Sequence, residues 1–187
     1  MQTPRTALLV MDAQRGVVER SGNAAVLDAM ARAVGAARAA GIPVIHVVVG
    51  FRPGYPEVSP RNRTFAGIRA AGRFTPEDPG AEIHPAVAPA PGEPVVTKHR
   101  VSAFSGSDLD TVLRAASIET LALSGIATSG VVLSTLRQAA DLDFRCVVLA
   151  DACADPDPLV HQVLLERVFP RQADVLRVAE WSGGLGG

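Results

Sequence analysis

The sequence is poor in cysteine, in net charge and in long apolar runs, and each shortage excludes a class of protein. Its two cysteines, Cys146 and Cys153, cannot hold 187 residues together by disulfide bonds, so we expect a reduced, cytoplasmic setting. The formal net charge of −1 gives no basic surface for nucleic acid or for an anionic membrane. The apolar runs are much shorter than a membrane span, and the N-terminal residues lack the pattern of a signal peptide.

The usual cofactor and nucleophile motifs are missing as well. No pair of histidines has the H-x-x-x-H spacing of a metal site; the four are His46, His84, His99 and His161. No Gly-x-Gly-x-x-Gly or Walker pattern indicates a nucleotide cofactor, and no Gly-x-Ser-x-Gly elbow indicates an α/β-hydrolase. We therefore expect neither a cofactor nor a metal ion.

Short apolar runs alternate with helical patterns along the chain. Hydrophobic residues make up 48% of it and charged residues 20%, as in an ordinary globular domain. The runs predict strands at 6–11, 43–49, 95–97, 121–124 and 145–150, with a short last strand within 173–179. Helical spacing predicts helices at 24–40, 108–116, 129–142 and 159–168. This alternation predicts one α/β domain over residues 1–187, built on a parallel sheet with right-handed crossovers.

Two of the predicted strands end in a charged residue. Asp12 follows the first apolar run, and Lys98 follows the third. Because ligands bind at the carboxyl ends of strands in open α/β sheets, the two side chains are candidates for a site. If their strands are neighbours, Lys98 keeps the carboxylate ionised, or the pair passes a proton to a substrate. A purely structural ion pair explains the same two residues equally well.

A turn at 125–130 joins the fourth strand to the next helix. Backbone N–H groups at such a helix start favour a bound anion or a developing oxyanion. The long stretch 50–94 holds most of the prolines and predicts a lid, a binding loop or an interface arm. Within it, Arg52, Arg61 and Arg63 favour an anionic or carboxylated substrate, although a solvated loop surface explains them as well.

Four segments resemble the isochorismatase-like hydrolase superfamily and occur in its order. They are LLVMDAQ at 8–14, VTKHRVSAF at 96–104, GIAT at 125–128 with Ser134 and Thr135 downstream, and LADA at 149–152. The resemblance implies a Rossmann-like three-layer α/β/α sandwich around a central parallel sheet. It also implies a hydrolase of small molecules that forms a homo-oligomer, either a dimer or a tetramer.

The resemblance assigns roles to several residues. In the family's amidases an Asp and a Lys activate a Cys nucleophile, and Asp12 and Lys98 match the first two. The oxyanion hole would lie at the N–H groups of Ala127 and Val131, next to a cis peptide bond between Ile126 and Ala127. The remaining substrate-binding candidates lie in or beside the matching segments, with the loop 52–74 completing the pocket; they are Gln14, Arg100, Phe104, Thr128 and Ser129.

The sequence departs from the family pattern where the nucleophile is expected. Val131 occupies the position of the amidase Cys, and a valine cannot attack a carbonyl. The family's metal-binding segment is also missing, since Gly50-Phe-Arg-Pro53 stands there. We therefore expect a non-covalent hydrolase in which Asp12 is the general acid or base and Lys98 tunes and orients it. Two alternatives are a catalytically silent small-molecule binder on the same scaffold and an amidase that uses Cys153.

Overall fold

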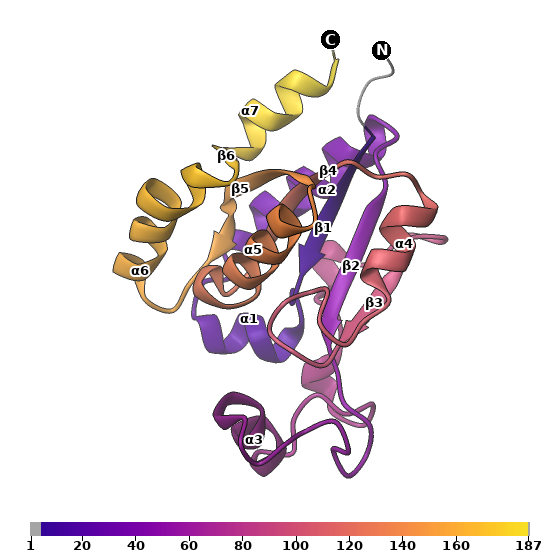
Figure 1. The fold of residues 1–187 in the computed structure, drawn as a ribbon, viewed down its shortest axis with the longest axis vertical. Coiled ribbons are helices and arrows are strands. Elements are labelled where there is room, and N and C mark those ends of the chain that lie inside the picture. The colour runs from indigo at the N-terminus through magenta and orange to yellow at the C-terminus, as the bar shows by residue number, and fades with distance from the viewer. Residues whose placement is uncertain (1–4, 187) are drawn as a thin grey trace.

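The chain folds around one six-stranded sheet in which every neighbouring pair of strands is parallel. The computed structural model describes residues 5–186, and its strand order is β3-β2-β1-β4-β5-β6 (Figure 1). The strands are β1 (Thr6–Met11), β2 (Val44–Val49), β3 (Val95–Lys98), β4 (Thr120–Ile126), β5 (Arg145–Ala154) and β6 (Asp174–Leu176). The order reverses between β1 and β4, which is where such sheets bind ligands.

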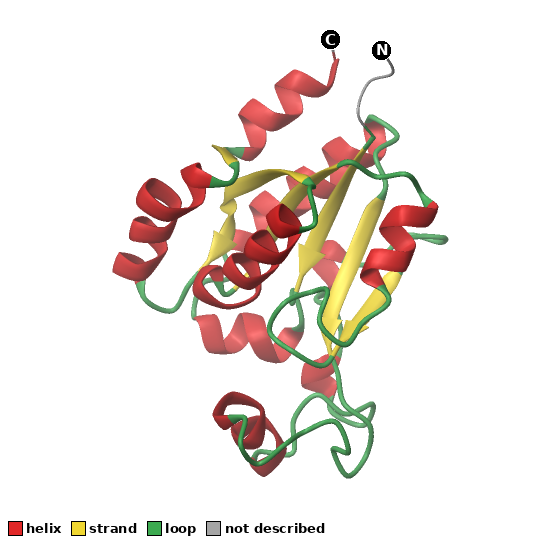
Figure 2. Cartoon of the chain, in the orientation of Figure 1, coloured by secondary structure: helices red, strands yellow, loops and turns green. Residues whose placement is uncertain are grey.

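Helices cover both faces of the sheet, so the architecture has three layers (Figure 2). The α-helices are α1 (Arg15–Ser21), α2 (Val26–Ala39), α3 (Arg63–Ala70), α4 (Leu109–Ala115), α5 (Leu133–Asp141), α6 (Pro158–Val163) and α7 (Val178–Gly183). One core cluster joins α4 and α5 to the sheet, and the other joins α1, α2 and α7 to its opposite face. The predicted α/β fold with a central parallel sheet is therefore confirmed.

The alternation of buried side chains in β1 explains why the two cores share this strand. Leu9 and Met11 pack into the first core, whereas Leu8 and Val10 pack into the second. Successive side chains of a strand point to opposite faces, so a strand covered on both sides reads as a continuous apolar run. This is why the short run at 6–11 could be recognised in the sequence, and it fixes Asp12 at the central carboxyl edge.

The structure also corrects several element boundaries. The helices α1, α3 and α7 were not predicted, and the stretch 173–179 holds only the short strand β6 before α7 begins. The strand β5 continues past 150 to Ala154, with a register shift against β4 between Leu123 and Gly125. The helix predicted from 129 begins as a π-helical turn, Thr128–Val132, that leads into α5.

The first part of the segment 50–94, up to residue 74, forms a separate small core at the carboxyl edge of the sheet. Phe51, Tyr55 and Val58 pack there with Phe65 of α3 and with Phe74. In Figure 1, α3 and the loops next to it lie beyond the arrowheads of β1 and β2. The segment is therefore in place to close the edge at which Asp12 and Lys98 lie. No helix within residues 5–186 is long and apolar enough to span a bilayer.

Candidate active site

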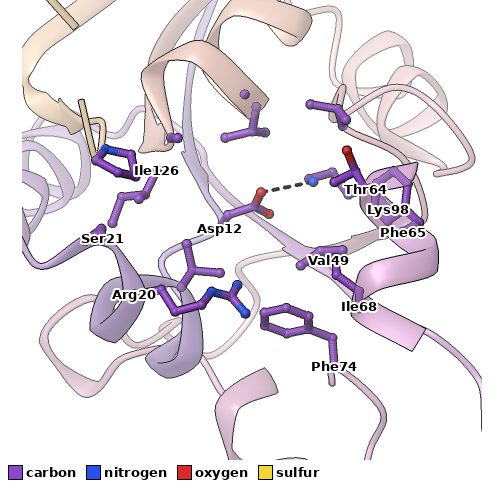
Figure 3. Close-up of a pocket in the computed structure, with 16 residues that line it drawn as sticks. Asp12, Arg20, Ser21, Val49, Thr64, Phe65, Ile68, Phe74, Lys98 and Ile126 are labelled. Atoms are coloured by element: carbon purple, nitrogen blue, oxygen red, sulfur yellow. Dashed lines mark ion pairs between the residues drawn. The ribbon is translucent and has the colours of Figure 1, made fainter. Parts of the chain in front are cut away.

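A cavity of about 240 Å³ lies where β1, β2, β3 and β4 end and the segment 50–94 folds over them. Its walls come mostly from apolar side chains, with three charged residues among them (Figure 3). The lining residues are Asp12, Val17, Arg20, Ser21, Val49, Thr64, Phe65, Ile68, Phe74, Lys98, Val101, Ile126, Ala127, Gly130, Val131 and Pro156. Asp12, Lys98, Ala127 and Val131, which the sequence placed around one pocket, all line this cavity.

The centre of the cavity is a buried ion pair. The Nζ atom of Lys98 lies 3.0 Å from Oδ2 of Asp12, and the two side chains are 3% and 10% exposed. The ammonium also donates a hydrogen bond to the main-chain oxygen of Arg100 at 3.0 Å. The other carboxylate oxygen of Asp12, Oδ1, is buried and has no hydrogen-bond partner among the described residues. One oxygen is therefore held by Lys98, and the second remains for a ligand or a water molecule.

The backbone at Asp12 turns sharply after the strand. Its φ of 56° lies in the left-handed region, and its N–H donates to the carbonyl of Val47 at 2.8 Å. Burial raises the pKa of the Asp12 carboxyl, and the neighbouring Lys98 ammonium offsets part of that rise. A buried carboxyl with a raised pKa is suited to exchange a proton with a substrate.

The turn after β4 brings its backbone to the same cavity. Gly125 lies so close to β1 that a Cβ atom on it would approach the carbonyl oxygen of Met11 to 2.9 Å, so a glycine is required there. The peptide bond between Ile126 and Ala127 is cis, as predicted. Val131 is buried and lines the cavity from the other end of the turn.

Three N–H groups of this turn already have partners inside the protein. The N–H of Ser129 donates to Oδ2 of Asp155 at 2.7 Å. The N–H groups of Gly130 and Val132 donate to the carbonyl oxygen of Ala127 at 3.1 and 3.3 Å. Any contact between this turn and an anion must therefore come from its other N–H groups.

The five predicted substrate-binding side chains are not among the residues that line the cavity. Gln14 is buried, exchanges two 2.9 Å hydrogen bonds with the main chain of Val49 and donates to Ala81. Its role in the structure is to tie α1 and the segment 50–94 to β2. Ser129 does not line the cavity, and its N–H donates to Asp155 instead.

The other three candidates are held in packing or hydrogen-bond contacts of their own. Phe104 is buried in the first core, with its ring 6.0 Å from that of Phe144. Thr128 Oγ1 lies 2.8 Å from Nδ1 of His161 on α6. Arg100 donates to the carbonyl of His99, and its Cζ atom lies 5.9 Å from the centroid of the Phe65 ring. The loop 52–74 does contribute lining residues, as expected.

Neither cysteine faces the cavity. Cys153 is 4% exposed, its Sγ lies 3.9 Å from the carbonyl oxygen of Leu123, and burial raises its pKa to about 12. Burial likewise raises the pKa of Cys146 to about 11. Because the thiolate is the reactive form, both thiols are poor nucleophiles in these positions. The structure therefore does not support an amidase that uses Cys153.

The sequence reading missed the contribution of α1 and named the wrong arginines for the cavity. Arg20 on α1 lines the cavity, whereas Arg52, Arg61 and Arg63 do not. Arg52 is 73% exposed and pairs with Glu57 instead. Arg20 lies in α1, the helix that follows Asp12, and this proximity in the sequence was the available signal that Arg20 could reach the site.

Comparison with known proteins identifies the family of this fold and site. A model of the isochorismatase domain matches residues 6–180. The chain belongs to the isochorismatase family. It is 34% identical to the ureidoacrylate amidohydrolase RutB of Methylobacterium radiotolerans, over 97% of this chain and 80% of that protein. It is therefore a hydrolase of the isochorismatase family, and its relatives include amidohydrolases.

Solved structures of the isochorismatase family agree with this assignment. A cysteine hydrolase from Pseudomonas syringae pv. phaseolicola is 25% identical, with a TM-score of 0.88 over 99% of this chain and 98% of that one. N-carbamoylsarcosine amidase from Thermoplasma acidophilum is 28% identical, with a TM-score of 0.76 over 93% and 96%. Within residues 5–186 of this family member, no group of three or more His, Cys, Asp or Glu side chains is arranged to hold a metal ion.

Proposed function

We propose that this protein hydrolyses a small, carboxylated molecule without a covalent intermediate, using Asp12 to move the proton and Lys98 to orient it. The observation that carries the proposal is the buried ion pair at the centre of the cavity, in which Oδ1 of Asp12 has no partner among the described residues. No cysteine lines the cavity, and the resemblance in sequence implies that Val131 occupies the position of the amidase nucleophile. Water is then the attacking group.

In the proposed reaction, Oδ1 of the Asp12 carboxylate accepts a proton as the water oxygen bonds to the electrophilic carbon of the substrate. The bond to the leaving nitrogen or oxygen then breaks, and the same proton passes from Asp12 to the leaving group. Lys98 holds the other carboxylate oxygen, so the carboxyl group does not rotate away. The N–H groups of Ala127 and Val131 would bind the negative charge that develops on the substrate.

The test is a substrate screen with the wild-type protein and with Asp12→Asn. Amides and ureides are included because RutB and N-carbamoylsarcosine amidase are relatives, and vinyl ethers because the family includes isochorismatases. We expect Asp12→Asn to lower turnover by about 10²–10⁴-fold, the usual cost of losing a positioned acid or base. The matched control is Asp28→Asn, an exposed aspartate on α2.

Two results would contradict the proposal. Turnover by Asp12→Asn equal to that of the wild type would show that the carboxyl group moves no proton in the reaction. Binding without turnover across the screen would favour the alternative of a silent small-molecule binder, in which the 3.0 Å contact of Asp12 with Lys98 is a structural ion pair.

A further inference from the structure

The cavity contains one charge that no other lining residue balances. Its charged lining residues are Asp12, Lys98 and Arg20, and the first two neutralise each other across 3.0 Å. Arg20 has no ion pair and no side-chain hydrogen bond to any of residues 5–186, and its guanidinium lies against the ring of Phe74 instead. Since an arginine stays protonated at neutral pH, the lining residues carry a net charge of about +1.

Arg20 is held in a position from which it can bind an anion. It lies in the last turn of α1, and its Cζ atom is 5.1 Å from the centroid of the Phe74 ring. Figure 3 shows the side chain reaching toward Phe74 on the side of the cavity below Asp12. A guanidinium stacked on a ring keeps its in-plane N–H groups free, and two of them match the oxygens of one carboxylate.

Two acidic residues, Asp78 and Glu19, act on Arg20 through their charges, but neither forms an ion pair or a hydrogen bond with it. The charge of Asp78 acts on Arg20, but its Oδ2 accepts from the N–H of Phe74 at 2.7 Å and its Oδ1 from the N–H of Gly80 at 2.8 Å. Burial lowers the pKa of Arg20, and the charge of Arg73 lowers it further. A bound anion would relieve the repulsion between the two arginines.

The size and polarity of the cavity restrict what the anion can be. At about 240 Å³ it is smaller than the ~300–1,000 Å³ pockets that hold drug-sized ligands. Phe65, Ile68 and Val101 make the walls apolar, so a ligand must be mostly apolar as well. One unbalanced positive charge matches a monoanion, whereas a dianion would leave an uncompensated negative charge against these walls.

We propose that Arg20 selects the substrate by binding the carboxylate of a small monoanion, whose apolar body lies against Phe65 and Phe74. The placing of the reacting bond at Asp12 rests on the proposed function; the selection of a carboxylate by Arg20 does not. Arg20 is thus a specificity-determining residue contributed by α1, and Arg52, Arg61 and Arg63, which do not line the cavity, have no part in the selection.

The test measures binding and needs no turnover. Isothermal titration calorimetry of the wild-type protein measures the preference for a carboxylate. The ligands are two matched pairs, benzoate with benzamide and crotonate with crotonamide. We expect Arg20→Gln to weaken carboxylate binding by about 10- to 100-fold, the value of charge-assisted hydrogen bonds, and to leave amide binding nearly unchanged. Arg20→Lys should keep part of the preference that Arg20→Gln loses, because lysine has the positive charge but not the planar pair of N–H donors that can bind both carboxylate oxygens.

Arg63→Gln is the matched control, since Arg63 is exposed beside the lining residue Thr64 but does not itself line the cavity. It should leave both affinities unchanged, and circular dichroism checks that all variants are folded. A wild-type protein that binds neither carboxylate more tightly than its amide would overturn the proposal. So would an Arg20→Gln variant that keeps the preference.

The two proposals can fail separately. A protein that turns over no substrate but prefers carboxylates through Arg20 would contradict the proposed hydrolysis and support the selection. A protein that loses turnover in Asp12→Asn but keeps its carboxylate preference in Arg20→Gln would do the opposite. Tighter binding of phenyl phosphate than of benzoate would show that the site prefers a dianion, and it would overturn the proposal that the ligand is a monoanion.

Discussion

Replacing Lys98 with methionine removes one half of the buried ion pair while keeping a side chain of similar length. The Lys98 and Asp12 side chains are 3% and 10% exposed, so the substitution leaves a largely buried carboxylate without its counter-charge. Removing one partner of a buried pair typically costs ~3–5 kcal/mol of stability. We expect Lys98→Met to lose an amount in this range at pH 8.

The loss should depend on pH, and its sign follows from the pKa of Asp12. Burial already raises that pKa in the wild-type protein, and the substitution removes the ammonium of Lys98, which offsets that rise most strongly. A carboxyl whose folded-state pKa exceeds its unfolded value of about 3.9 binds its proton more tightly when folded. The contribution of this group to the free energy of unfolding is then fully present below the unfolded-state pKa. It falls as pH rises toward the folded-state pKa, by up to ~1.4 kcal/mol per pH unit. Lys98→Met should therefore be less destabilised at pH 5 than at pH 8.

Urea denaturation at the two pH values measures both effects. Trp181 is the only tryptophan and is buried in the core that α7 shares with the sheet, so its fluorescence reports global unfolding. The double variant Asp12→Asn/Lys98→Met removes both charges and should be more stable at pH 8 than Lys98→Met alone. A loss that is equal at pH 5 and pH 8, or one below ~1 kcal/mol, would refute the reasoning that Asp12 is ionised beside Lys98.

Two further predictions concern the thiols and the assembly. Cys153→Ala should leave turnover nearly unchanged, and iodoacetamide should label the wild-type protein slowly, because burial raises the pKa values of Cys146 and Cys153 to about 11 and 12. Val131→Cys should label readily, since its thiol would face the cavity near Lys98; a substrate-derived acyl group on Cys153, seen by mass spectrometry, would contradict the non-covalent mechanism. Light scattering should give a mass of at least twice the 19.5 kDa chain, and Val163→Asp, on the exposed apolar face of α6, should lower it if that face joins the subunits.

The parts of the fold and site that could be predicted are those that one strand determines locally. A strand covered on both faces reads as a continuous apolar run, and the residue after it must lie at the carboxyl edge. This reasoning placed Asp12 and Lys98 correctly at one cavity, although β1 and β3 are separated by β2 in the sheet. Their 3.0 Å contact depends on the length of the lysine side chain as well as on the strand order.

The parts that could not be predicted depend on contacts between distant segments. Gln14 follows Asp12 closely in the sequence, yet the main chain of Val49 takes both ends of its amide, which leaves none for a ligand. Arg20 reaches the cavity because Phe74, from the middle of the segment 50–94, provides the ring against which it lies. Neither partner could be inferred from local spacing, because the first contact forms when β2 pairs with β1 and the second when the segment 50–94 folds over the sheet edge.

The close approach of β1 and β4 links the fold to the proposed chemistry. A Cβ atom on Gly125 would lie 2.9 Å from the Met11 carbonyl oxygen and 3.3 Å from Cγ1 of Val131, so the two strand ends are as close as a glycine permits. This contact places Asp12, the residue after Met11, beside the turn that carries Val131. A water molecule activated by Asp12 would then approach a substrate next to that turn, where a cysteine would otherwise attack. In the mechanism that we propose, a valine at this position removes the covalent step but leaves the proton transfer and the backbone that would bind the oxyanion. This is why we expect the substitution at Val131 to change the nucleophile and Asp12 to remain indispensable.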